Sequence, residues 1–133
     1  MNIKIIHNDT ELSINPEQHI TYARQVIWVG VRSTEVYNTI SIEGLDTFQC
    51  TIAYNKSDNT WRLTSGQVRT HCARGLKSDR SRACSLCRGC CGYIHTANPD
   101  YSLRVPAMST LLNGTPVPEE GMTLKDGDTI HFQ

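Results

Sequence analysis

Short apolar runs separated by turn signals constrain the fold of this 133-residue chain more than any other feature of its sequence. Runs such as QVIWVGV, TISI, FQCTIAY and TIHF are rich in β-branched residues or alternate apolar with polar positions, as β strands do. The stretches INPE, YNKSDNT, LNGTP and KDGD are typical of turns. No segment sustains the 3.6-residue apolar period of a helix. The sequence therefore predicts a single all-β domain over residues 1–133.

The apolar positions of the predicted strands should form its buried core. They are Val26, Ile27, Val29, Ile40, Ile42, Cys50, Ile52, Trp61, Leu63, Leu112, Leu124, Ile130 and Phe132. Cys50 lies apart from the other five cysteines, in the middle of a strand-like run. We therefore expect it to act as a small core hydrophobe rather than as a functional thiol.

Residues 66–106 break this rhythm and are predicted to be an insertion within the sandwich. The segment shows no clear strand alternation, and it holds five of the six cysteines. Between Gly66 and Gly92 there are six basic residues and one acidic residue, a net charge of +5 in a chain whose overall charge is zero. A loop of this length is uncommon in a compact domain unless something local orders it.

The cysteine spacing predicts that this ordering agent is one structural zinc ion. Cys72, Cys84, Cys87, Cys90 and Cys91 follow the pattern C-x11-C-x2-C-x2-C-C. Structural zinc takes four thiolate or imidazole ligands in a tetrahedron, and a C-x2-C turn places two sulfurs on the same side. Cys84 and Cys87 are the obvious pair, and Cys72 is the obvious upstream ligand.

The fourth zinc ligand is either Cys91 or Cys90. If residues 84–91 are roughly helical, Cys91 lies within about 20° of Cys84 around the helix axis, whereas Cys90 lies about 120° away. This favours Cys91, but Gly89 and Gly92 weaken the helical premise, so Cys90 remains a substitute. His71 and His95 are further reserves, because imidazole is also a zinc ligand.

Other uses of the five thiols stay open. An iron–sulfur cluster uses a similar spacing, but the usual fourth cysteine with a following proline is absent. Disulfides would leave one thiol over and need an oxidising compartment. Free reactive thiols are a third alternative, since nearby bases lower thiol pKa values. The N-terminal stretch MNIKIIHNDTEL does not resemble a signal peptide, and no apolar run is long enough to span a bilayer, so we expect a cytoplasmic protein.

Three stretches of the chain resemble the forkhead-associated (FHA) domain family. VGVRSTEVYNTISI is similar to the Gly-Arg-Ser turn and the following Asn-x-Ile strand, and LDTFQCTIAYNKSDNTWRL is similar to the Ser-x-x-His-Ala-x-Ile strand and the Trp-x-Leu strand. TLLNGTPVPEEGMTLKDGDTIHF resembles the end of the domain. The resemblance covers residues 20–133 without the cysteine segment. It implies an FHA-like β-sandwich of about eleven short antiparallel strands, with peptide-binding loops at one end.

The resemblance also implies phosphothreonine recognition, and its residues carry over only in part. Arg32 lies near the family arginine that binds phosphate, although Val31 intervenes after Gly30. The family serine falls at Asp46, with Thr47 adjacent. A carboxylate near a phosphate dianion weakens binding by like-charge repulsion. The implied phosphate pocket is therefore degenerate or relocated.

The remaining family positions depart from the pattern as well. The family histidine falls at Gln49. Where the family has the asparagine that clamps the peptide backbone, this sequence offers Met108, Ser109 or Thr110. Asn113 matches a later, structural turn instead, and we keep Asn113 and Ser109 as candidate peptide contacts.

Together these observations predict a non-enzymatic protein-interaction module, of a kind used in signalling. Phosphorylated and unphosphorylated proteins are both candidate partners. No nucleophile elbow, phosphate loop or His-Glu-x-x-His motif is present. The alternative function is binding of nucleic acid or another acidic partner through the basic insert, as zinc knuckles do. Tyr93 is the aromatic residue beside the cysteines, and base stacking favours more of them.

Overall fold

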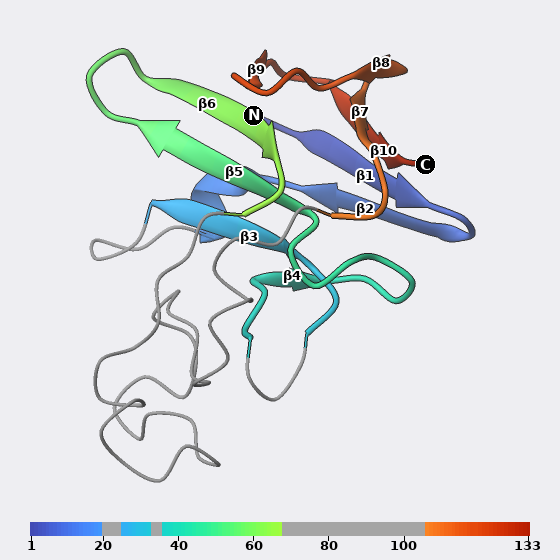
Figure 1. The fold of residues 1–133 in the computed structure, drawn as a ribbon. Coiled ribbons are helices and arrows are strands. Elements are labelled where there is room, and N and C mark those ends of the chain that lie inside the picture. The colour runs from blue at the N-terminus through green and yellow to red at the C-terminus, as the bar shows by residue number, and fades with distance from the viewer. Residues whose placement is uncertain (20–24, 33–35, 68–105) are drawn as a thin grey trace, which may run out of the picture.

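The computed structural model describes residues 1–19, 25–32, 36–67 and 106–133 as ten β strands and one 3-10 helix (Figure 1). The elements are β1 (Ile3–His7), β2 (Thr10–Ile14), η1 (Pro16–His19), β3 (Val26–Gly30), β4 (Ile40–Ser41), β5 (Cys50–Asn55), β6 (Thr60–Ser65), β7 (Thr110–Leu112), β8 (Thr115–Pro116), β9 (Met122–Leu124) and β10 (Thr129–Phe132). Within these ranges, no helix is long and apolar enough to cross a membrane. The prediction of an all-β fold is confirmed.

The strands form two five-stranded sheets, in the orders β2-β1-β10-β7-β8 and β4-β3-β5-β6-β9. Most neighbours are antiparallel, as expected for strands joined by short turns. Two pairs depart from the expected antiparallel arrangement, because β1 pairs with β10 in parallel and β3 pairs with β4 in parallel. In the first pair the strands come from opposite ends of the chain, so no tight turn fixes their direction. Both sheets are therefore mixed.

One hydrophobic core joins the two sheets. Isoleucines of β1 and β2 in the first sheet pack in the same cluster as residues of β3, β5 and β6 in the second. Every predicted core residue is buried except Val26, which is half-buried at the start of β3. Ile3, Ile5 and Ile14 complete the core from the N-terminal hairpin. Burial of this one apolar cluster from both faces is what stabilises the sandwich.

Cys50 lies in this core and is fully buried. Burial in apolar surroundings raises the pKa of the Cys50 thiol far above its ordinary value, because the thiolate would lose its hydration. The thiol therefore stays protonated and packs as a small hydrophobe, which confirms the expectation from the sequence.

The predicted zinc ligands Cys72, Cys84, Cys87 and Cys91, with the substitute Cys90, lie outside the described residues. The reserve histidines lie outside them as well. Of the predicted insert 66–106, the structure describes Gly66 and Gln67 at its start and Pro106 at its end. These two ends come close together, since a Cβ atom built on Gly66 would lie 3.4 Å from Cδ of Pro106. The insert therefore leaves and rejoins the sandwich at one place.

Candidate functional site

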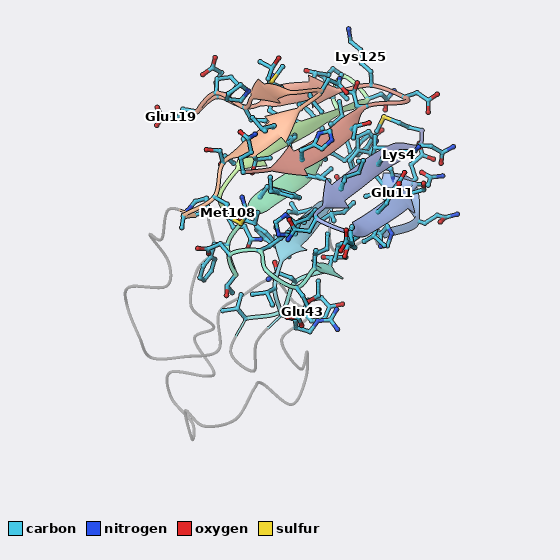
Figure 2. The ribbon with its side chains drawn as sticks, turned by 90° about the vertical axis from the view of Figure 1, so that its right-hand side faces the viewer. Lys4, Glu11, Glu43, Met108, Glu119 and Lys125 are labelled. Atoms are coloured by element: carbon cyan, nitrogen blue, oxygen red, sulfur yellow. The ribbon has the colours of Figure 1, made fainter. Side chains whose placement is uncertain are left out.

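The loops at one end of the sandwich bring together three of the residues that the sequence singles out. The β3–β4 loop carries Arg32, and the β4–β5 loop carries Asp46 and Thr47. The two loops touch directly, because the backbone N–H of Val31 donates to the carbonyl of Asp46 at 3.3 Å. Figure 2 shows Glu43 of the β4–β5 loop below the strands and Met108 at mid-height, with Lys125 at the opposite, upper end of the view.

Arg32 is exposed, but its guanidinium is held in place. Its Nε and Nη2 both donate to the carbonyl oxygen of Asn38, at 3.3 and 3.0 Å. The guanidinium carbon lies 4.7 Å from the centroid of the Tyr37 ring, a cation–π geometry. Its backbone N–H donates to Oγ of Ser41 at 2.9 Å. The loop thus presents a positive, planar group whose outer N–H donors make no hydrogen bond to any other described residue.

Asp46 holds the β4–β5 loop together through its side chain. Oδ1 accepts a hydrogen bond from the backbone N–H of Phe48 at 2.9 Å, and Oδ2 accepts one from that of Ala107 at 3.4 Å. Asp46 makes no ion pair with Arg32, since the one ion pair within the described ranges joins Lys4 to Glu11. The carboxylate is therefore an acceptor for the protein's own backbone, and it offers no hydroxyl donor for a phosphate.

Removing this acceptor should measurably destabilise the loop. We expect Asp46→Ala to lower the free energy of unfolding by about 1–2 kcal/mol, because two backbone N–H groups lose their partner. Asp46→Asn keeps an oxygen at Oδ1 for the 2.9 Å bond to Phe48 and should cost clearly less. Urea unfolding of the two variants checks this. No loss of stability in Asp46→Ala would show that the Asp46 side chain does not hold the loop.

Gln49 performs a similar task from the base of the same loop. It is fully buried at the start of the β5 region, at the position that the resemblance assigns to the family histidine. Its Oε1 accepts from the backbone N–H of Asp46 at 3.3 Å. Its Nε2 donates to the carbonyl of Met108 at 3.0 Å and lies 3.2 Å from Oγ1 of Thr110. Gln49 therefore ties the β4–β5 loop to the segment that leads into β7.

Asn38 and Gln67 are buried polar residues that reasoning from the sequence did not single out. Asn38 has no exposed surface, and its Nδ2 donates to the carbonyls of Val31 at 3.0 Å and Thr47 at 2.8 Å. Gln67 donates to Oδ1 of Asn38 at 2.8 Å. Asn38 stands in the YNTISI motif, but nothing in the local pattern marks its side chain as buried. Their burial follows from loops that meet only in the folded chain.

The other candidate contacts are placed differently. Ser109 is exposed and pairs its backbone with that of Gln133, at 2.7 and 3.1 Å. Asn113 lies in the turn between β7 and β8 with a left-handed backbone, at φ 51°. Its Nδ2 donates to Oδ1 of Asp128 at 2.8 Å, and its Oδ1 accepts from the N–H of Thr129 at 2.9 Å. Asn113 thus holds the turn against β10, whereas Arg32, Asp46 and Thr47 are gathered in the loop cluster.

The described ranges contain no group of three or more histidine, cysteine or acidic side chains that could hold a metal ion. The zinc prediction falls on the cysteines of the insert, which lie outside these ranges, and it stays a prediction. Comparison with known proteins finds no family model that matches the chain, no similar curated protein and no similar solved structure. The function must therefore be inferred from the loop geometry and from the sequence.

Proposed function

We propose that this protein is a non-enzymatic protein-interaction module of FHA type, with a degenerate phosphothreonine pocket and a structural zinc site in its insert. The observation that carries the proposal is the exposed Arg32 guanidinium, held by Asn38 and Tyr37 where the β3–β4 and β4–β5 loops meet. A cation fixed in advance loses little conformational entropy when it meets an acidic or polar partner. The loop end of a rigid sandwich is a common place for such recognition.

Among the described residues, the proposed pocket holds the arginine but departs from the family pattern at two further positions that would make phosphate binding strong. Binding a dianionic phosphate needs charge-assisted hydrogen bonds from an arginine, a hydroxyl and backbone amides. Asp46 stands where the hydroxyl is expected, and its carboxylate already accepts two backbone N–H groups. Ser109 stands near the clamp position without the carboxamide of an asparagine. Two lost hydrogen bonds and the added negative charge weaken binding by about a thousandfold or more.

The described ends of the insert lie at the same end of the sandwich. Its first described residue after Gly66, Gln67, bonds to Asn38, which in turn holds Arg32. Directly after its other end, the backbone N–H of Ala107 donates to Oδ2 of Asp46. A zinc-ordered, basic insert would therefore stand beside the Arg32 loop and enlarge the surface that a partner meets. The proposed occupant is an acidic protein segment, which complements a net charge of +5 between Gly66 and Gly92.

Titration calorimetry with a phosphothreonine peptide library tests the proposed function. We expect no peptide to bind the Arg32 loops more tightly than about 1 mM. Weaker attraction of acidic peptides to the insert should fade between low and physiological salt, because exposed charges are screened within about 10 Å at 0.1 M. The same titrations with Arg32→Ala provide the control.

The contrary result is also well defined. Micromolar binding that needs the phosphate, survives the higher salt and disappears in Arg32→Ala would show an intact phosphothreonine pocket. The proposal of a degenerate pocket would then be wrong, and Asp46 would have to turn away from its backbone partners to admit the ligand.

A further inference from the structure

The chain makes a sharp, well-bonded turn where it leaves β6 for the insert. Gly66 has a left-handed backbone, at φ 79°, which a residue with a Cβ atom rarely adopts. Its N–H donates to the carbonyl of Gln49 at 2.8 Å, and its carbonyl accepts from Oγ1 of Thr51 at 2.8 Å. This turn places the next residue, Gln67, at the end of β5, where its side chain also reaches β3.

Gln67 is then buried with its amide nitrogen among three oxygens. Nε2 lies 2.9 Å from the carbonyl of Val29 in β3, 3.1 Å from the carbonyl of Cys50 in β5 and 2.8 Å from Oδ1 of Asn38. Only 5% of the residue is exposed. Val29 and Cys50 are cross-strand partners, so the Gln67 side chain spans the end of the β3–β5 ladder. A buried amide with these bonds has one stable position, since leaving it would strand several buried polar groups.

Asn38 links Gln67 to Arg32 through hydrogen bonds. The Asn38 side chain is fixed on three sides, by Val31, Thr47 and Gln67. Its backbone carbonyl is the acceptor for both Nε and Nη2 of Arg32. Gln67 is linked to the guanidinium through Asn38, because its Nε2 donates to Oδ1 of Asn38 and the backbone carbonyl of Asn38 accepts from Arg32.

We infer that Gln67, at the start of the insert, is a positioning residue for Arg32. It fixes the side chain of Asn38, and the backbone carbonyl of Asn38 fixes the guanidinium. A partner that breaks the hydrogen bonds of Gln67 would free the Arg32 side chain. A partner that binds Arg32 in its present position would in turn stabilise those hydrogen bonds. Such coupling is reciprocal by thermodynamic necessity. The inference deepens the proposed function, because it names a residue that regulates the proposed Arg32 surface.

Nuclear magnetic resonance of the Arg32 Nε–H group in the full chain tests the inference without any ligand. The signal is assigned by its loss in Arg32→Lys. We expect Gln67→Met, which keeps the length but removes the amide, to shift this signal and to speed its exchange with solvent by about tenfold or more. Thr51→Val is the matched control, because it removes the hydrogen bond to the carbonyl of Gly66 and leaves the hydrogen bonds of Asn38 in place. It should leave the Arg32 signal unchanged.

An unchanged Arg32 signal in a folded Gln67→Met protein would overturn the inference and leave Gln67 a purely structural residue. If Gln67→Met fails to fold, Gln67→Asn retains the amide but is one methylene too short to reach all three oxygens, and the same criterion applies to it. A shift of equal size in Thr51→Val would also contradict the inference. Because no peptide is present, these outcomes are independent of the peptide titrations that test the proposed function.

Discussion

Replacing Gly30 with alanine should destabilise the protein by about 3 kcal/mol. A Cβ atom on Gly30 would lie 2.5 Å from the carbonyl oxygen of Thr47 and 2.6 Å from that of Asp46. Both are backbone atoms, so relief requires moving the whole β4–β5 loop. Hydrogen bonds from the buried side chains of Asn38 and Gln49 hold that loop in place. The close approach of β3 to this loop is the feature that only glycine permits.

Gly114→Ala separates this steric effect from backbone strain. Gly114 has a left-handed backbone, at φ 84°, but no atom lies within 4 Å of its added Cβ. Its substitution should cost about 1–2 kcal/mol, from the backbone alone. Gly30 is not among the described residues with positive φ, so its cost is steric. Urea unfolding compares the two. A Gly30→Ala protein no less stable than Gly114→Ala would show that the loop moves freely.

Substituting Cys87→Ser should abolish zinc binding while the sandwich stays folded. Structural zinc sites contribute about 10–16 kcal/mol of apparent binding free energy, and they need all four ligands. Cys87 is the central residue of the C-x2-C-x2-C run, so it serves in either choice of fourth ligand. All ten described strands lie outside the cysteine segment. The metal content should fall from one zinc per chain to none, with cooperative thermal unfolding of the sandwich retained.

Cys50→Ala serves as the control, because it should lower the stability of the sandwich without changing the zinc content. Cys50 is fully buried in the core, so its truncation should lower the free energy of unfolding by about 1 kcal/mol. Because it lies outside the cysteine run, the zinc content should not change. Elemental analysis and thermal unfolding of both variants complete the comparison. A Cys87→Ser protein that keeps its zinc, or that loses the cooperative transition of the sandwich, would contradict the proposed division of roles.

The strands and their core were accessible from sequence because their signal is local. Alternation in FQCTIAY places Cys50 and Ile52 on one face, and both are buried. The Asn-Gly turn at Asn113 behaves as such turns do, with both residues at positive φ. The pairing of β1 with β10 was not predictable in the same way. It joins residues about a chain length apart, and no local pattern encodes a parallel contact of that kind.

The candidate site was harder to predict from the sequence, because the residues that hold its loops in place are polar. Asn38, Gln49 and Gln67 lie in stretches that read as loops or strand ends, and each is buried by segments distant in sequence. Asp46 shows the same limit. Its sequence position suggests a charge facing a ligand, whereas in the structure its oxygens accept backbone N–H groups of Phe48 and Ala107. Sequence gives the residue type, but the direction of a side chain depends on tertiary contacts.

The proposed design is an FHA-type sandwich interrupted at its binding end by a zinc-ordered insert. It is tested most directly by the zinc content, measured together with thermal unfolding, of the intact chain and of a chain with residues 68–105 replaced by a short Gly-Ser linker. The nearness of Gly66 to Pro106 makes such a linker feasible. We expect one zinc per intact chain, none in the shortened chain, and cooperative unfolding in both. Iron or no metal in intact protein purified without chelator, or a shortened chain that does not unfold cooperatively, would contradict it.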